Sequence, residues 1–144
     1  RRFWVVDVNQ HRVLYQELVA HGKNSGGNYA TRFSDSSGSR ASSIGTFVTA
    51  KTAYQGQHGV SLRINGLEPG FNDKAADRAV VVHGAAYVSE DFAKKHGRLG
   101  LSWGCPALDQ KVVKPGINEI KGGSVIGAYY PDRKWLHASH YLNG

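Results

Sequence analysis

The sequence predicts a single mainly β domain with two or three short helices. Short runs of β-branched and aromatic residues recur along the chain, whereas helical patterns are few and brief. The length of 144 residues suits one compact domain with its own hydrophobic core. No internal repeat and no linker composition divides the chain, so we expect residues 1–144 to form one unit.

Six segments have the alternating or continuously apolar composition of strands. The turn-like tripeptide Asn9-Gln10-His11 separates the first two segments, which predicts a hairpin. Asn65-Gly66 is a turn signal after the fourth segment. The fifth segment is the most apolar and is expected to be a central strand. In chain order the six segments are residues 3–8, 12–19, 45–49, 58–64, 78–82 and 124–130.

Residues 89–97 predict a short helix. Ser89 can cap its start, and Glu90-Asp91 suits the positive end of the helix dipole. Lys94-Lys95 suits the negative end, and Gly97 stops the helix.

The remaining segments are less regular. Residues 109–113 predict another short helix, which Pro115-Gly116 would interrupt before residues 117–121 continue it at an angle. The stretch 21–43 is rich in Gly, Ser and Asn and predicts a loop; loops this long are usually functional or mobile. No element is predicted for the aromatic and histidine-rich tail, residues 131–144.

Basic residues outnumber acidic ones, and the formal net charge is +7. Such a charge attracts anionic polymers, including nucleic acid, acidic lipid headgroups and bacterial cell wall. The basic residues are scattered and no nucleic-acid motif is present, so we expect no nucleic-acid partner. A solvated basic surface explains the charge as well as a binding patch does. We also expect no transmembrane segment and no internal disulfide, and a signal peptide would have to precede Arg1.

Cys105 is the only cysteine of the chain and lies in Ser102-Trp103-Gly104-Cys105-Pro106. A cysteine nucleophile needs an imidazole that takes its proton, and His83, at the end of an apolar run, is the candidate. The alternative is structural, with a buried thiol and a core histidine. Groups that could orient the second nitrogen of His83 are the carbonyl of Gly84 and the carboxylates of Asp73 and Asp77.

The neighbours of Cys105 favour activation of the thiol. Pro106 could be the first residue of a helix, which would place Cys105 at the positive end of the helix dipole. Gly104 would let a substrate approach the backbone closely. Because Pro106 has no N–H, an oxyanion hole would use the amides of Trp103, Gly104 or Cys105.

These motifs resemble the signature of the YkuD-type L,D-transpeptidases, which is His-Gly, a spacer, and then Ser/Thr-His-Gly-Cys. His83-Gly84 and Ser102-x-Gly104-Cys105 follow this order. Ser42-Ser43-Ile44-Gly45-Thr46-Phe47 resembles the upstream Thr-Pro-x-Gly-x-Phe element, with Ser43 in place of proline. The divergent second branch is most similar, since its His-Gly-Ala, Gly-Arg-Leu-Gly and Ser-Trp-Gly-Cys-Pro blocks resemble residues 79–107. The resemblance covers roughly residues 3–132.

The resemblance implies a YkuD-like β-sandwich or barrel and a periplasmic or otherwise extracytoplasmic enzyme that acts on peptidoglycan stem peptides. By position, Cys105 would attack the L-centre carbonyl of diaminopimelate in a tetrapeptide stem and expel D-Ala. The acyl group would then pass to an amine of a second stem. His83 would act as base and then as acid, with its ring steadied by the carbonyl of Gly84. No metal or other cofactor is implied, and carbapenem β-lactams are expected to acylate the cysteine.

Two positions depart from the family's pattern. Trp103 stands where most members have histidine, and Ala107 where most have Arg or Asn. Candidate substrate contacts, for which an ordinary solvated polar face is the alternative, are Ser102, Arg98, Arg63, Ser61, His58, Tyr54 and Asn72. His137 and His140 could form half a metal site, but no partner cluster has ligand spacing, so no metal is expected.

The departures leave the acyl acceptor open. Another diaminopimelate, the amine of the first stem residue, and water in an L,D-carboxypeptidase all fit, as does detachment of wall-bound protein. A non-catalytic basic module that binds wall polymer is the alternative from a different class of function.

Overall fold

The structure is a computed structural model that describes residues 1–144. It is mainly β, as the sequence predicts. The strands are β1 (Phe3–Asp7), β2 (Arg12–Glu17), β3 (Val19–Ala20), β4 (Gly45–Thr49), β5 (Tyr54–Gly56), β6 (Gly59–Gly66), β7 (Val81–Ala85), β8 (Ala107–Asp109) and β9 (Val125–Ala128). There are four short α-helices where two or three were expected. The helices are α1 (Glu90–His96), α2 (Val113–Ile120), α3 (Arg133–Ala138), α4 (His140–Asn143) and the 3-10 turn η1 (Lys23–Ser25).

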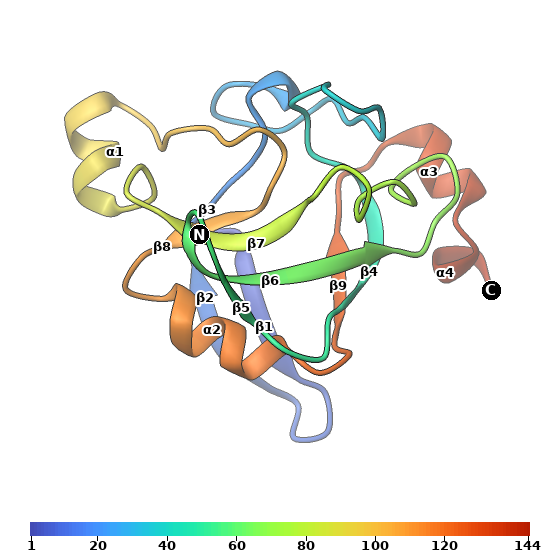
Figure 1. Cartoon of the computed structure of the whole chain (residues 1–144). Helices are drawn as coiled ribbons and strands as arrows, with labels where there is room; N and C mark the ends of the chain where they lie inside the picture. Colours follow the sequence, from blue (N-terminus) through green and yellow to red (C-terminus); the bar gives the residue numbers. More distant parts are fainter.

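The larger sheet has the strand order β3-β8-β7-β6-β4-β9, and β5 pairs with β6. Strands β7 and β8 run parallel, and the other strand pairs are antiparallel. β1 and β2 form a separate hairpin. Figure 1 shows β6 and β7 crossing the middle of the molecule, with the loop from β3 to β4 on one side and α2 on the other. The curled sheets agree with the sandwich architecture that the resemblance implies.

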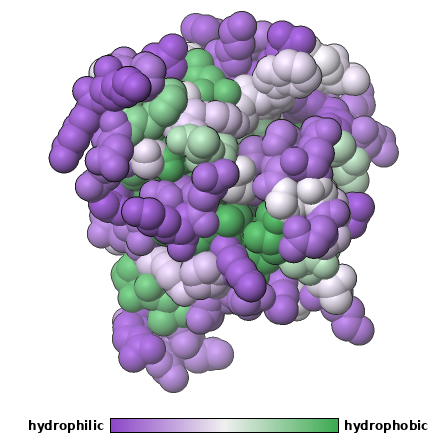
Figure 2. All heavy atoms as spheres, turned by 60° about the vertical axis from the view of Figure 1, so that its left-hand side comes forward, coloured by the Kyte–Doolittle hydropathy of each residue, from purple (hydrophilic) through white to green (hydrophobic).

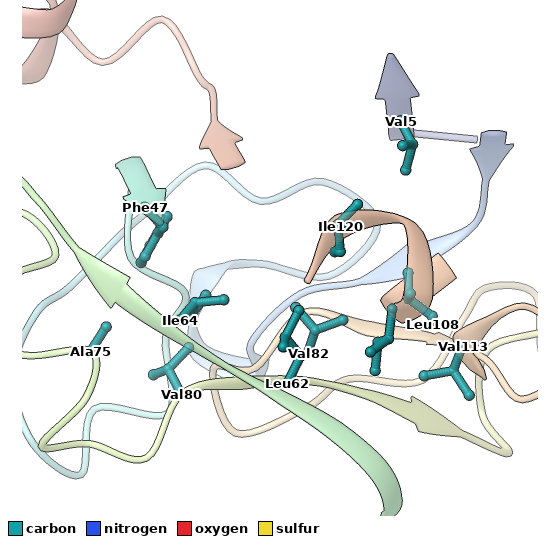
Figure 3. Packing of buried hydrophobic residues seen from close by; sticks show 11 residues of the cluster. Val5, Phe47, Leu62, Ile64, Ala75, Val80, Val82, Leu108, Val113 and Ile120 are labelled. Atoms are coloured by element: carbon teal, nitrogen blue, oxygen red, sulfur yellow. The ribbon is translucent and has the colours of Figure 1, made fainter. Parts of the chain in front are cut away.

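Alternation along β6 and β7 separates the core from the opposite face of the sheet. Leu62 and Ile64 of β6 and Val82 of β7 belong to the core, and α2 packs against them with its buried side (Figure 3). Ser61 and His83 alternate with these residues and therefore point to the other face. The full core cluster is Val5, Phe47, Leu62, Ile64, Ala75, Val80, Val82, Leu108, Val113, Ile117 and Ile120.

β7 does not have its predicted extent of residues 78–82, because it begins at Val81 and continues to Ala85. Ala79 has a φ of 56°, a left-handed conformation that breaks an extended chain. Its amide donates a hydrogen bond to the carbonyl of Ala76 at 3.0 Å, so a turn precedes β7. As a result His83 lies in the middle of a strand and not at its end.

β6 also runs further than predicted. It includes Asn65-Gly66, which pairs with Val48 and Phe47 of β4, so the predicted turn at this dipeptide is wrong. A Cβ on Gly66 would lie 1.8 Å from the carbonyl oxygen of Asn72, and glycine is therefore required for packing. The sequence did not predict β5, which has three residues.

The N-terminal hairpin is confirmed in a shorter form, with Phe3 paired to Glu17. Val19, expected in its second strand, instead pairs with Leu108 in the larger sheet. β4 has the predicted bounds, and β9 lies within the predicted segment 124–130.

α1 is confirmed with both of its predicted ends. The Ser89 hydroxyl accepts a hydrogen bond from the amide of Phe92 at 3.0 Å, and Gly97 has a φ of 83°. α2 differs from expectation because Pro115 lies in its first turn, where a missing N–H loses no helical hydrogen bond. Asp109 belongs to β8 instead of a helix. The helices are all too short or too polar to cross a membrane.

The C-terminal tail, for which no element was predicted, folds back as α3 and α4 on a buried carboxylate. Glu68 accepts hydrogen bonds at Oε2 from the amide of Thr46 at 2.7 Å and from the indole of Trp135 at 3.1 Å. Glu68, Trp135 and Ser139 are all buried. Burial alone would raise the pKa of Glu68, but Ser139, Trp135 and Thr46 stabilise its charged form and hold the pKa below its usual value. The ionised carboxylate therefore attaches the tail to β4.

We predict that Glu68→Gln lowers the unfolding free energy at about pH 7 by roughly 1–3 kcal/mol, because two donors lose a charged acceptor. The folded-state pKa of Glu68 is depressed, so its ionisation stabilises the fold above the unfolded pKa, and this contribution is lost as the pH falls through the folded pKa. Urea unfolding of wild type and variant should therefore differ more at neutral pH than in acid. Glu119→Gln, an exposed position on α2, is the control. Equal losses in the two variants would contradict the role of Glu68.

Candidate active site

The nucleophile loop, defined here as residues 102–106, is fixed by Ser102. The Ser102 hydroxyl donates to the carbonyl of Cys105 at 2.6 Å and accepts from the amide of Gly104 at 3.1 Å. The backbone of Ser102 is joined to the 21–43 loop by two hydrogen bonds. The Ser102 amide donates to the carbonyl of His21 at 3.0 Å, and the Ser102 carbonyl accepts from the amide of Lys23 at 2.8 Å. Ser102 is buried, and its hydroxyl both donates and accepts within the loop, so it shapes the loop from the inside.

Gly104 is required by packing within the protein. Its φ is 124°, and a Cβ at this position would lie 2.8 Å from the carbonyl oxygen of Ala41 and 3.3 Å from Nη2 of Arg78. The space that we assigned to substrate is thus occupied by the 21–43 loop and by an arginine that the sequence analysis did not single out.

The Cys105 thiol lies against the start of β7. Its Sγ accepts a hydrogen bond from the amide of Val81 at 3.4 Å, and the thiol points to the carbonyl of Ala79 at 3.8 Å. Burial raises the pKa of Cys105, while the Val81 amide and the positive charge of Arg78 oppose this rise. The predicted helix after Cys105 is absent, because Pro106 leads directly into β8. No helix dipole therefore activates the thiol.

His83 is buried in the middle of β7, and the expected hydrogen bond to its neighbour is present. Its Nδ1 lies 2.9 Å from the carbonyl of Gly84. A carbonyl only accepts, so Nδ1 carries the proton and Nε2 keeps its lone pair. Burial lowers the pKa of His83; the Gly84 carbonyl opposes this, and the charge of His58 lowers the pKa further. Near neutral pH the ring is an uncharged potential base.

The parallel register relates the thiol to the imidazole. His83 is opposite Ala107 of β8, so Cys105, two residues earlier, comes level with Val81. The His83 ring and Sγ are not joined by a hydrogen bond; the partners of Sγ are Val81 and Ala79. The two groups thus belong to neighbouring positions along the same pair of strands.

Four other residues named in the sequence analysis gather on the same face as His83. Ser61 is directly opposite His83, and Tyr54 is opposite Ser61. The guanidinium of Arg63 lies 3.9 Å from the centre of the Tyr54 ring. The imidazole of His58 stacks on that of His83, with 4.4 Å between ring centres and 21° between planes.

Two predicted contacts are placed elsewhere. Asn72 is fully buried; its side chain donates to the carbonyl of Thr46 at 2.9 Å and accepts from the amide of Glu68 at 2.8 Å, so it has a structural role. Arg98 borders a polar cavity of about 410 Å³ with Arg1 and Arg2, next to α1 and not on the face of His83. In the view from the α1 side, hydrophilic side chains cover most of the surface (Figure 2).

The sequence analysis missed three residues around the nucleophile loop. Arg40 lies over the indole of Trp103, 4.2 Å from the ring centre, and that indole is 70% exposed. Burial raises the pKa of Tyr87, and the charge of Cys105 raises it further. Arg78 packs against Gly104. Residue type alone gives no signal for these positions, because each depends on contacts between remote segments.

The structure contains no group of three or more His, Cys, Asp or Glu side chains that could hold a metal ion. The site contains the Cys105 thiol, which accepts a hydrogen bond from a backbone amide, and the neutral imidazole of His83 with the proton on Nδ1. The exposed Trp103 indole lies nearby under Arg40. A thiol and a neutral imidazole are the two groups that a cysteine nucleophile and its base require.

One protein family matches the chain. No curated protein and no solved structure gives a significant match to the chain. The YkuD_2 family model, described as the L,D-transpeptidase catalytic domain, matches residues 1–129 and so covers the hairpin, the larger sheet, His83 and Cys105. The chain belongs to the family of L,D-transpeptidase catalytic domains.

Proposed function

We propose that this domain is a peptidoglycan L,D-transpeptidase that uses Cys105 as its nucleophile and His83 as its base. The observation that carries the proposal is the joint placement of the two groups, with Sγ on the Val81 amide and the imidazole two residues further along the same strand. The substrate would be a tetrapeptide stem, and the domain would act outside the cytoplasmic membrane, where this polymer lies. Family membership supports the substrate class.

The reaction has two halves. Sγ attacks the L-centre carbonyl of diaminopimelate, a thioester forms, and the bond to the terminal D-Ala breaks. His83 takes the thiol proton and gives it to the departing amine. An amine of a second stem then attacks the thioester, loses its proton to His83, and forms the cross-link while the thiol is restored.

Both reacting groups start uncharged. Burial raises the pKa of the thiol and lowers that of the imidazole, which opposes a resting thiolate–imidazolium pair. The proton must therefore move when the substrate is bound, and catalytic hydrogen bonds commonly tighten at that stage.

The oxyanion hole we propose uses two of the three amides considered from the sequence. The Gly104 amide is excluded because it donates to the Ser102 hydroxyl. The amides of Trp103 and Cys105 donate no hydrogen bond within the chain and are available to a developing oxyanion.

Substrate contacts are proposed on two cation–aromatic pairs, Arg40 on Trp103 and Arg63 on Tyr54. A stem peptide carries carboxylates, which guanidinium groups bind, and apolar methylenes, which pack on aromatic rings. Ser61 lies between Tyr54 and His83 in the sheet, and His58 stacks on His83.

The central experiment incubates the purified domain with a tetrapeptide muropeptide and identifies the products by mass spectrometry. Cross-linked dimers with released D-Ala are expected. Tripeptide alone would show an L,D-carboxypeptidase instead, and unchanged substrate would favour a non-catalytic wall-binding module.

We predict that a carbapenem adds one covalent adduct to the wild-type protein and none to Cys105→Ala, as measured by intact mass. Cys105→Ser should lose almost all turnover, since a hydroxyl is a far weaker nucleophile near neutral pH. Turnover in the serine variant, or an adduct on the alanine variant, would contradict the assignment of Cys105.

We predict that His83→Ala slows acylation about 10²–10⁴-fold, the range usual for loss of a general base. Single-turnover kinetics of carbapenem acylation measure this rate directly. An unchanged rate would assign the base to another group, with His58 the first alternative.

We predict that His58→Phe raises the pKa of His83, because the ring stack is kept while the positive charge beside it is removed. A neutral His83 is needed as base, so the acid limb of the pH profile for acylation should move to higher pH. NMR titration of the His83 ring provides the direct measurement. His96→Phe on α1 is the control, and equal titration curves for the two variants would contradict the coupling.

We predict that Trp103→His changes the distribution of cross-linked products, because the exposed indole lies next to the nucleophile and under Arg40. Muropeptide analysis with mixed acceptors tests this. An unaltered product profile would exclude Trp103 from acceptor choice.

A further inference from the structure

Arg78 is the most heavily hydrogen-bonded side chain near the nucleophile, although the proposed chemistry does not use it. Its Nη1 donates to the carbonyl of Ser34 at 3.0 Å and to the hydroxyl of Ser43 at 2.8 Å. Its Nη2 donates to the hydroxyl of Ser39 at 3.0 Å and to the carbonyl of Ala41 at 2.9 Å. All of these acceptors belong to residues 34–43, so one guanidinium closes this segment into a fixed loop.

The bonded loop is in direct contact with the nucleophile loop. A Cβ on Gly104 would fall against both the Ala41 carbonyl and Nη2 of Arg78, at 2.8 and 3.3 Å. Arg78 therefore fixes the surface on which Gly104, and with it the neighbouring cysteine, rests. Because Arg40 belongs to the same segment, the guanidinium over Trp103 is positioned by the same contacts.

The residues that follow Arg78 hold the sulfur itself. Ala79 presents its carbonyl to the thiol, and Val81 donates its amide to Sγ. Ala79 does so with a φ of 56°, a conformation that costs a non-glycine residue energy and that clusters at functional sites. Four consecutive residues, 78–81, thus bind the loop through a side chain and the thiol through the backbone.

Arg78 also supplies charge. The groups that act on the sulfur are the Val81 amide and Arg78, both of which lower the pKa of Cys105 against the larger effect of burial. Burial, and then the charge of Cys105, raises the pKa of Tyr87, so its phenol carries no charge near neutral pH. His83 forms no hydrogen bond with Sγ, and no helix begins after Cys105. The guanidinium is thus the cation that favours ionisation of the thiol.

We propose that Arg78 is a positioning residue of the active site, which holds residues 34–43 against the nucleophile loop and, from its place beside Gly104, favours the thiolate of Cys105. That Arg78 assists catalysis rests on the proposed function. The holding of residues 34–43 and the effect on the thiolate, however, are properties of the protein without substrate. They are measured without peptidoglycan, so their failure is distinguishable from the failure of the transpeptidase assignment.

The electrostatic part is tested by the pH dependence of Cys105 alkylation with iodoacetamide, which reacts with the thiolate. In Arg78→Gln we expect the thiol pKa to rise, with a loss of roughly three- to tenfold in alkylation rate near neutral pH, since a rise of one unit corresponds to tenfold less thiolate. Arg133→Gln removes the same charge from exposed α3 and should leave the curve unchanged. Identical curves for the two glutamine variants would overturn this part of the proposal.

The mechanical part is tested by hydrogen exchange at the amides of residues 34–43. The double variant Ser39→Ala, Ser43→Ala keeps the charge but removes two acceptors of Arg78. We expect faster exchange in this segment with a nearly unchanged thiol pKa. Arg78→Lys should behave similarly, because lysine keeps the charge but lacks the planar fork. Unchanged exchange in both variants would overturn the role of Arg78 in holding the loop.

Arg78→Gln is informative only when folded, so its thermal midpoint and far-UV spectrum are measured alongside. If it unfolds, Arg78→Lys and the serine pair still decide the mechanical part. Arg78→Met, which keeps an unbranched apolar stem without the charge, then replaces Arg78→Gln in the alkylation experiment, and a thiol pKa equal to that of wild type would overturn the electrostatic part. Wild-type alkylation with the expected Arg78 dependence, but no cross-linking of a tetrapeptide, would leave the inference standing and reject the proposed reaction.

Discussion

Strands β7 and β8 run side by side in the same direction, and this pairing aligns His83 with Ala107 and Gly84 with Leu108. Parallel neighbours need a long connection, and here it contains α1 and the nucleophile loop. The connection must return the chain to the start of β7 before β8 can begin. Cys105 is the penultimate residue of that return, so its position follows from the register of the two strands.

The ladder also explains how the sulfur is held. The His83 amide donates to the carbonyl of Pro106 at 3.3 Å, as a parallel pair requires. Two residues earlier, the Val81 amide would face another carbonyl, but it donates to Sγ instead. The thiol therefore completes the hydrogen-bond pattern at the end of the β7–β8 ladder, while the other face of the sheet forms the hydrophobic core.

The elements that the sequence predicted well are those set by local chemistry. The hairpin, β4 and α1 depend on alternation, turn residues and caps within a few positions of each other. β7 and β6 were misjudged at their ends because the left-handed turn at Ala79 and the contact of Gly66 with Asn72 leave no pattern in the neighbouring residues. The tail was not predicted because its anchor joins Trp135 to Glu68, far apart in the chain.

At the site, the thiol, the imidazole and the Gly84 carbonyl were recognisable from their motifs. Asn72 and Ser102 are instead buried and hydrogen-bonded within the fold. Arg78 could not be recognised because its contacts are with a distant loop.

The 21–43 loop is joined to the nucleophile loop at Ser102 and to β7 through Arg78. Surface loops ordinarily tolerate insertions and deletions, because their lengths do not affect the scaffold. Here a single residue inserted into the loop would displace either the backbone hydrogen bonds to Ser102 or the groups that accept hydrogen bonds from Arg78. Grafting residues 102–106 alone onto another scaffold would accordingly not reproduce the position of the thiol. The 21–43 loop would have to be grafted as well, at unchanged length.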